Sequence, residues 1–403
     1  MLTGKTVVLA VTGSIAAYKI ANLARMLKKL HADVQVLMTQ NATNFINPIT
    51  LETLTNQKCL IDTFDRNFQY SVEHVALAKR ADVVLVAPAS ANVIGKLANG
   101  IADDMLTTTI LACPCKKWIS PAMNHNMYHN PIVQDNIQKL ERFGYGIIPP
   151  ATGMLANGDT GDGRMPEETV LLEYLLREIA YPKDLAGKKF LISAGATQEA
   201  LLQQKALDPV RFLTNHSSGK MGCALARAAM QRGAEVTLVA AHMEVAPPPF
   251  VKVVRVTSAA DMAEAILPVA AEYDCIIKAA AVSDYTPVST STEKIKKADG
   301  TLTVSFQRTT DILKTLGEHK PEHLFLCGFS METENVIENS RKKLHSKHCD
   351  MICANSLRKA GAGFGGDTNI ITILTAEREI ELEQMTKDEA AHRILDTILE
   401  SGF

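Results

Sequence analysis

Short apolar runs alternate with helical patterns in two separate series, and this alternation restricts the fold more than any other feature of the chain. In the first series, apolar runs at 6–11 and 34–38 flank residues with helical spacing between 20 and 30. The second series begins at 190–193 and ends in a hairpin and a helix near the C-terminus. Strands that alternate with helices predict parallel sheets covered on both faces. We therefore expect an α/β chain with two different three-layer domains in tandem.

The segment between the two series marks a domain boundary. A proline and a glycine interrupt the pattern within 181–188, which predicts a linker there. The expected domains are residues 1–180 and residues 189–403. Just before the linker, residues 151–166 are rich in Gly and polar side chains and have no periodicity. Such a stretch predicts a mobile functional loop or a disordered tract.

The charge balance excludes several classes of function. Lys and Arg total 42 and Asp and Glu total 44, which gives a formal net charge of −2. A nucleic-acid-binding surface or a polybasic membrane anchor would need a basic excess. No apolar run approaches the roughly 20 residues of a membrane span, and the N-terminal residues lack a signal-peptide cleavage pattern. We expect a cytoplasmic protein that binds neither nucleic acid nor membranes.

The cysteines indicate a reduced chain rather than a disulfide framework. Eight cysteines in 403 residues are too few for a disulfide-stapled fold. His345, His348, Cys349 and Cys353 resemble part of a zinc site, but no second pair stands at zinc-finger spacing. Packed core is the favoured interpretation of Cys353 and its apolar neighbours.

Two turns of small and polar residues stand where helices are expected to begin. One covers residues 12–18 after the first strand, and the other covers residues 215–222. Backbone N–H groups at helix starts bind anions, so both turns favour a phosphate or nucleotide. Neither turn contains G-x-G-x-x-G or a complete Walker A sequence, which makes an ordinary dinucleotide-dependent reductase a weak alternative. A polar helix cap explains Ser217 and Ser218 alone but not the whole second turn.

The first half carries motifs that resemble a known family. Residues 121–128 resemble the P-x-M-N-x-x-M-W motif of flavin-dependent cysteine decarboxylases, with Tyr128 in place of Trp. His74 matches the catalytic histidine of that family and is suited to proton transfer near neutral pH. Residues 87–92 and 102–108 resemble its flavin-binding segments.

This resemblance implies FMN as the cofactor of the first half. It implies that Asn124 is catalytic and holds the substrate carboxylate, and that Met127 lines the substrate pocket. A cysteine carboxylate has no electron sink of its own, and the flavin supplies one. By the same match, the FMN-binding residues are Gly13, Ser14, Thr39, Ala89, Ser90, Ala91, Asn92, Thr107 and Ala122.

The second half resembles phosphopantothenate–cysteine ligase. Residues 208–222 closely match its signature, and residues 279–285 and 293–297 match two further motifs. The resemblance implies that CTP with Mg²⁺ converts 4′-phosphopantothenate to an acyl-cytidylate, from which cysteine displaces CMP. It places Asn215 in the second step and Arg211 at the substrate, whereas the metal is held through the CTP phosphates. The implied CTP-site residues are Lys278, Ala279, Ala280, Asp284, Lys294, Thr310, Asp311, Ile312, Leu313, Phe329, Lys343 and Lys347.

The order of the two halves is similar to that of the bifunctional family of bacterial coenzyme A synthesis. The resemblance implies two tandem Rossmann-like domains, a flavodoxin-like FMN decarboxylase and then the ligase, which together make 4′-phosphopantetheine. Decarboxylase trimers combined with ligase dimers imply a homododecamer. Two alternatives remain: a flavoprotein regulatory subunit, and an oxidative cysteine decarboxylase that stops at the ene-thiol.

One departure from the family pattern affects the decarboxylase. The family has a proton-donating cysteine in a loop that reads L-A-C-G-D-x-G, and this chain has Asn157 at that position. An amide has no proton that transfers near neutral pH, so we expect an impaired reduction step. Three interpretations are open: an engineered variant that traps an intermediate, a natural enzyme with another donor, or a decarboxylase half that ends at the ene-thiol.

A second departure lies beside the expected ligase site. Residues 198–207 are longer than the family's connection, and Ala196 and Ala200 replace residues that are often Gly or Pro in the family. Each doubling of loop length costs only about 0.6 kcal/mol in closure entropy. We therefore expect ligase activity to survive with an altered loop.

Overall fold

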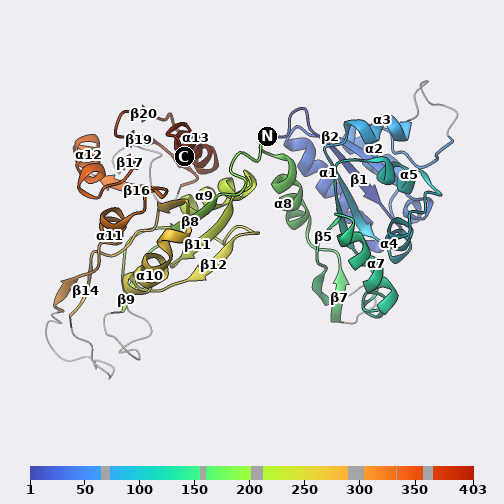
Figure 1. Ribbon diagram of the computed structural model, residues 1–403. Coiled ribbons are helices and arrows are strands. Elements are labelled where there is room, and N and C mark those ends of the chain that lie inside the picture. Colours follow the sequence, from blue (N-terminus) through green and yellow to red (C-terminus); the bar gives the residue numbers. More distant parts are fainter. Residues whose placement is uncertain (65–72, 155–159, 201–211, 289–303, 333, 357–365) are drawn as a thin grey trace. The chain divides into compact units, whose positions relative to one another are not determined.

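The computed structural model describes residues 1–64, 73–154, 160–200, 212–288, 304–332, 334–356 and 366–403 (Figure 1). Asn157, Arg211 and Lys294, three of the residues assigned above, lie outside these ranges. The chain divides into two compact units, Met1–Pro182 and Lys183–Phe403. Among the described residues, none of the helices has both the length and the apolar character of a membrane span.

The first unit contains a five-stranded parallel sheet with the order β2-β1-β3-β4-β5. Its strands are β1 (Thr6–Val11), β2 (Asp33–Met38), β3 (Val83–Ala89), β4 (Lys116–Pro121) and β5 (Gly146–Ile147). The chain passes from β1 to β2 on one side and continues with β3 on the other, so the strand order reverses between β1 and β3. This strand order is flavodoxin-like, and ligands bind at such a switch point.

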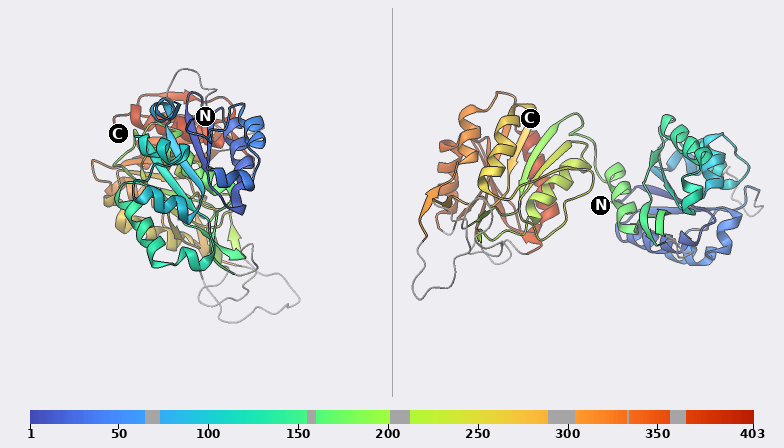
Figure 2. Two further views of the ribbon diagram at one scale, coloured as in Figure 1. Left: turned by 90° about the vertical axis from the view of Figure 1, so that its right-hand side faces the viewer. Right: turned by 90° about the horizontal axis from the view of Figure 1, so that it is seen from below.

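Helices cover both faces of this sheet (Figures 1 and 2). Val7, Leu9 and Val11 of β1 face one core, and the alternating residues Val8 and Ala10 face the other. The helices of the first core are α1 (Lys19–Lys29), α2 (Pro48–Thr55) and α8 (Glu168–Ile179). Those of the second are α3 (Glu73–Arg80), α4 (Ala91–Ala98), α5 (Met105–Ala112) and α7 (Pro131–Arg142). Each fully buried leucine or valine contributes about 1.5–3 kcal/mol, so both faces hold their helices firmly.

The two ends of segment 151–166 are regular, which corrects the expectation of a wholly irregular loop. Strand β6 (Ala151–Met154) pairs antiparallel with β7 (Thr160–Arg164). The strands include Gly, Thr and Asp rather than alternating apolar residues, and the antiparallel ladder and a Thr152–Asp162 hydrogen bond join them. Such strands leave no periodic signal in the sequence.

The second unit contains an eight-stranded sheet with the order β12-β11-β8-β13-β16-β17-β19-β20. Its strands are β8 (Lys189–Ala194), β11 (Glu235–Ala240), β12 (Lys252–Arg255), β13 (Cys275–Lys278), β16 (Phe325–Glu332), β17 (Met351–Ser356), β19 (Ile371–Thr375) and β20 (Glu379–Glu381). The first six are parallel, and the last two extend the sheet as the expected antiparallel hairpin. The parallel part has the Rossmann order, with its switch point between β8 and β13.

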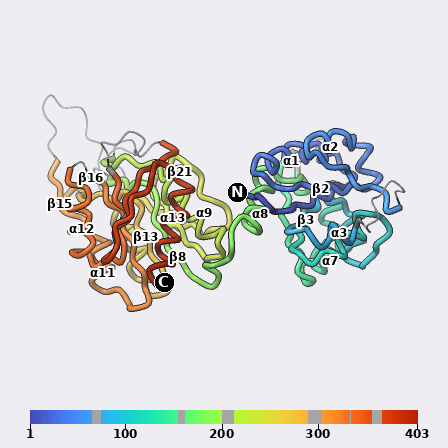
Figure 3. Tube along the Cα trace, turned by 90° about the horizontal axis from the view of Figure 1, so that it is seen from above, coloured from blue at the N-terminus to red at the C-terminus, as the bar shows by residue number. Residues whose placement is uncertain are grey.

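Helices α9 (Lys220–Gln231) and α13 (Lys387–Glu400) lie side by side on one face of this sheet (Figure 3). On the other face lie α10 (Ala259–Ile266) and α11 (Ile312–His319), and α12 (Val336–Ser346) packs on β16 and β17. Leu185, from the segment expected as a linker, is fully buried in the α9 core. All eight cysteines are free, and Cys353 is buried in β17.

Candidate active sites

In the first unit, the residues matched to FMN binding gather at the carboxyl edge of the sheet. Ser14 follows β1, Thr39 follows β2, Ser90 follows β3 and Ala122 follows β4. The hydroxyl groups of Ser14, Thr39 and Ser90 each accept a hydrogen bond from a backbone N–H in the first turn of a helix. These segments lie at one edge because parallel strands end on the same side of the sheet.

Thr12 joins the turns on either side of the switch point. Its buried Oγ1 donates to the Pro88 carbonyl at 2.6 Å and accepts from the Ser90 N–H at 2.9 Å. Next to it, a Cβ at Gly13 would lie 2.9 Å from Asn41 Cβ, so only glycine fits there without displacement. The sequence did not single out Thr12, although a threonine between a strand and a glycine is a signal for such a link.

Two further side chains define the polarity of this edge. Thr107 is fully buried and forms a capping box with Asp104, whose carboxylate accepts from its N–H and Oγ1, both at 2.8 Å. Ser120, at the end of β4, is also fully buried, and its hydroxyl has no partner among the described residues. A buried hydroxyl without a partner is costly, which favours a polar ligand group beside it.

The residues matched to substrate handling lie on two helices of the first unit. Asn124 caps the short helix α6 (His125–Tyr128) by accepting from Asn126 N–H at 2.9 Å, and Met127 is partly exposed on the same helix. His74 is the second residue of α3 and is half-buried. Helix α3 packs on α5, which carries Thr107.

A cluster of two histidines and one aspartate lies where the β6–β7 hairpin meets α6. Asp162 N–H donates to His125 Nδ1 at 3.2 Å, and His129 Nε2 lies 3.3 Å from Asp162 Oδ2. Among the described residues, this is the group close enough to share a metal ion. However, His125 accepts a backbone hydrogen bond at Nδ1, which leaves the proton of the neutral ring on Nε2. Metal-bound histidines instead donate from the second nitrogen, so the cluster is poorly arranged as a metal site.

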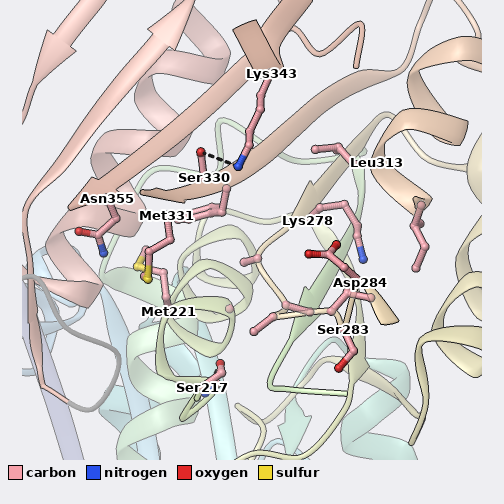
Figure 4. Close-up of a pocket in the computed structure, with 18 of the residues that line it drawn as sticks. Ser217, Met221, Lys278, Ser283, Asp284, Leu313, Ser330, Met331, Lys343 and Asn355 are labelled. Atoms are coloured by element: carbon pink, nitrogen blue, oxygen red, sulfur yellow. Dashed lines mark hydrogen bonds between the residues drawn. The ribbon is translucent and has the colours of Figure 1, made fainter. Parts of the chain in front are cut away.

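In the second unit, a cavity of about 300 Å³ opens at the carboxyl ends of β13 and β16 (Figure 4). Of the twelve residues matched to CTP, Lys294 lies outside the described ranges, and the other eleven line this cavity. They come from the end of β13, the loop that follows it, the start of α11, strand β16 and the C-terminal end of α12. The turn at 215–222, expected to bind a phosphate or nucleotide, contributes Ser217, Ser218, Gly219, Lys220, Met221 and Gly222, and the matched motif at 279–285 also contributes Ala281, Val282 and Ser283. Residues that the sequence did not indicate complete the wall: Thr309, Ser330, Met331, Asn355, Asn369 and Lys387.

Lysines face this cavity from several elements. Lys278, at the end of β13, is 6% exposed, and burial lowers the pKa of its amine to about 7, against an opposing effect of Asp311. Lys343 Nζ lies 2.6 Å from Glu332 Oε1 and 3.3 Å from Ser330 Oγ, as Figure 4 shows for the serine. Because Lys343 and Lys347 line one cavity, the four-residue spacing places both on one side of α12, as expected.

Hydrogen bonds hold the loop that follows β13. Ser283 N–H donates to Thr197 Oγ1 at 2.9 Å, and Thr309 Oγ1 donates to Ser283 O at 2.6 Å. Asn215 Nδ2 donates to Val282 O at 3.1 Å, so Asn215 lies against the same loop. In the cavity wall, the buried Ser283 Oγ and Asn355 Oδ1 have no partners among the described residues. These two atoms favour a ligand with hydrogen-bond donors.

Each unit therefore gathers small, polar and charged residues at the carboxyl edge of a parallel sheet. The chain is a two-domain α/β protein whose first unit has the strand order of a flavodoxin and whose second unit has a pocket typical of nucleotide sites. A family model described as Flavoprotein matches residues 1–180, and one described as DNA/pantothenate metabolism flavoprotein C-terminal domain matches residues 185–401. The coenzyme A biosynthesis bifunctional protein CoaBC of Bacillus subtilis (strain 168) is 46% identical over 99% of this chain and 97% of its own length. The chain belongs to this family of bifunctional coenzyme A biosynthesis proteins.

Two further proteins are similar to this chain, one over most of its length and one over its second half. A cysteine/cysteine sulfinic acid decarboxylase from an unknown prokaryotic organism is 43% identical over 88% of this chain and 99% of its own length. A crystal structure of the C-terminal domain of a CoaBC protein is 43% identical and covers 53% of this chain and 95% of that chain, with a TM-score of 0.44.

Proposed function

We propose that the chain catalyses two consecutive reactions of coenzyme A synthesis. The second unit joins 4′-phosphopantothenate to cysteine with CTP, and the first unit decarboxylates the product to 4′-phosphopantetheine with FMN. The observation that carries the proposal is the single cavity that collects eleven residues matched to CTP, at the switch point of a Rossmann-type sheet. Family membership over nearly the whole chain supports the same pair of activities.

In the ligase reaction, a carboxylate must first become an electrophile. The substrate carboxylate attacks the α-phosphorus of CTP and pyrophosphate leaves, and then the cysteine amine attacks the acyl carbon and CMP leaves. CTP enters with Mg²⁺ on its phosphates, and Lys343 and Lys347 supply further positive charge. Their ion pairs with Glu332 and Asp311 position both amines at the cavity wall. Asn215, held on the loop after β13, is placed to orient the acyl group for the second step.

In the decarboxylase reaction, the first unit holds FMN along the edge formed by Gly13, Ser14, Thr39 and Ser90. The lack of room beside Gly13, and a Ser120 hydroxyl with no partner in the described part of the chain, fit a ligand that lies close to the backbone and offers polar groups. Bound FMN supplies the electron sink that the loss of CO₂ requires. His74 then transfers protons, and the Asn124 amide holds the substrate carboxylate.

The assembly and location complete the proposal. The first units form trimers that share flavin sites, and the second units form dimers. Together, these contacts build a homododecamer in the cytoplasm. Native mass spectrometry checks this directly, since a dodecamer is expected and a monomer at micromolar concentration contradicts it.

One experiment tests the catalytic proposal against a regulatory flavoprotein. Purified protein is incubated with CTP, Mg²⁺, cysteine and 4′-phosphopantothenate, and CMP is measured with each component omitted in turn. The proposal expects yellow protein with noncovalent FMN and CMP release that needs both cysteine and phosphopantothenate. A colourless protein, or CMP release without cysteine, contradicts it.

An oxidative cysteine decarboxylase that ends at the ene-thiol is the second candidate. Asn157 favours it, because an amide lacks the proton that the final reduction consumes. It predicts CO₂ release without formation of the saturated thiol.

A further inference from the structure

The final reduction in the proposed decarboxylation needs a proton donor, and the family resemblance places that donor at residue 157 rather than at His74. Conversion of a carboxylate R–COO⁻ to R–H and CO₂ consumes one proton, whatever route the electrons take. At neutral pH, histidine is the side chain best suited to deliver it. Asn157, at the position that the family uses, has no transferable proton. The inference below rests on the proposed decarboxylation.

His129 and Asp162 form a hydrogen-bonded couple where α6 meets the β6–β7 hairpin. His129 Nε2 lies 3.3 Å from Asp162 Oδ2, and Thr152 Oγ1 donates to the other carboxylate oxygen at 2.6 Å. The Thr152 hydroxyl lowers the pKa of Asp162, and His129 adds to this effect. The Asp162 carboxylate therefore holds the His129 ring where α6 meets the hairpin, and histidine is the side chain that exchanges a proton most readily near neutral pH.

The couple lies beside the expected substrate position. Helix α6 follows β4 at the carboxyl edge of the sheet, and Asn124 is its N-cap. The β6–β7 hairpin is fixed to this segment because Met123 N–H donates to Gly163 O at 3.0 Å. Side chains larger than glycine do not fit at this contact, since a Cβ at Gly163 would overlap Met123 O and a Cβ at Gly161 would lie 2.8 Å from His125 Nδ1.

The neighbouring His125 has a different arrangement. Its Nδ1 accepts from Asp162 N–H at 3.2 Å, so protonation at that nitrogen would break the contact with β7. The rings of His125 and His129 have centroids 4.4 Å apart, and a second positive charge there would be unfavourable. His125 therefore secures the hairpin, whereas His129 is the member that can carry the proton.

We propose that His129, paired with Asp162, donates the proton of the final reduction in the decarboxylase half. Bound FMN would take two electrons from the substrate before CO₂ is lost, which leaves an ene-thiol, and would return them as a hydride to one carbon of its C=C bond. The ene-thiol receives the proton of the His129 imidazolium at the other carbon. Two C–H bonds form, the π bond and the imidazolium N–H bond break, and neutral His129 regains a proton from water.

The test uses the full-length FMN-loaded protein in single turnovers with phosphopantothenoylcysteine. The variants are His129→Gln and Asp162→Asn, and the matched control is His125→Gln, whose amide oxygen can still accept the Asp162 N–H. Mass spectrometry separates the ene-thiol from the saturated thiol, which carries two more hydrogen atoms. CO₂ release is followed in the same samples, and FMN affinity is measured by fluorescence titration of the apoprotein.

In His129→Gln, saturated thiol forms at least about tenfold more slowly and the ene-thiol accumulates, because a general acid contributes about 10²–10⁴-fold. In Asp162→Asn, saturated thiol also forms more slowly and the ene-thiol accumulates, because His129 loses the carboxylate that orients its ring. FMN affinity in His129→Gln and Asp162→Asn stays within about twofold of the parent, since the FMN edge is not altered. Thiol formation in His125→Gln also stays within about twofold, since the proton donor is not altered.

Three results overturn the inference. They are parent-like thiol formation in His129→Gln, an equal loss in His125→Gln, and a parent protein that yields only the ene-thiol. The first two leave CO₂ release and thiol formation by the parent intact, so the proposed decarboxylation survives them, whereas the third supports the second candidate, which ends at the ene-thiol. If the parent releases no CO₂, the proposed decarboxylation itself fails.

Discussion

Lys347 Nζ lies 3.0 Å from Asp311 Oδ2, so a cation at the end of α12 and a carboxylate at the start of α11 meet at the wall of the ligase cavity. Both side chains are partly exposed, and pairs of this kind contribute only about 0–1 kcal/mol. A triphosphate can therefore draw Lys347 away from Asp311 at little cost.

Replacement of this lysine tests its role in nucleotide binding. We expect Lys347→Gln to raise the KM for CTP about tenfold, since a charge-assisted hydrogen bond contributes about 1.5–3 kcal/mol. Lys342→Gln is the matched control, because Lys342 pairs with Glu338 at 2.7 Å elsewhere on the same helix. Its KM should stay within about twofold of the parent. Equal effects of the two variants in steady-state assays would show that Lys347 has no special role.

The buried amine of Lys278 predicts a proton-linked step. With a pKa of about 7, this amine is mostly neutral at pH 8, whereas an ordinary lysine is charged. A polyanion in the cavity raises that pKa again, so CTP binding should take up as much as about one proton between pH 7 and 9. Calorimetry in buffers of different ionisation enthalpy measures the uptake. Lys278→Met should abolish most of it, and unchanged uptake in that variant would assign the proton to another group.

Gly13 should be required for FMN binding because its backbone approaches Asn41 closely. A methyl group at residue 13 would lie 2.9 Å from Asn41 Cβ, so the turns after β1 and β2 must separate. We expect Gly13→Ala to weaken FMN binding at least about tenfold, and overpacking to cost about 1–3 kcal/mol in stability. The control is Gly95→Ala in α4, where the nearest atom is 3.7 Å away. Fluorescence titration and thermal unfolding measure both quantities, and parent-like FMN affinity in Gly13→Ala contradicts this account.

A thiol at residue 157 should substitute for His129. In the parent background, Asn157→Cys should change the rate of saturated-thiol formation by less than about threefold, because a donor is already present. In the His129→Gln background, the same change should restore the rate at least about tenfold. The double variant is compared with each single variant in single-turnover assays. A large gain in the parent background would mean that the parent lacks a working donor.

The architecture was predictable because it follows from periodicity. Alternating strand and helix patterns require parallel sheets, and parallel strands end at one edge, so the turn at Gly13, which follows β1, had to lie at a sheet edge. Residues as distant as Lys278 and Lys347 share a cavity because β13 and α12 belong to neighbouring crossover units. The family resemblance then indicated which side chains at these edges bind CTP.

Other features left no local signal. Strands β6 and β7 contain glycine and polar residues, so their pairing has no apolar alternation to reveal it. Asp162 is 33 residues from its partner His129, and no spacing rule relates a helix end to a hairpin strand. Within the described ranges Asn355 Oδ1 has no partner, which depends on the tertiary neighbours of a buried strand end that the sequence of β17 does not specify.

The most direct test of the two-reaction account is mass analysis of the products formed from 4′-phosphopantothenate, cysteine and CTP by the unaltered protein. The account predicts CMP, CO₂ and saturated 4′-phosphopantetheine in equal amounts. Accumulation of phosphopantothenoylcysteine without CO₂ would contradict it, because the first unit would then have no decarboxylase activity.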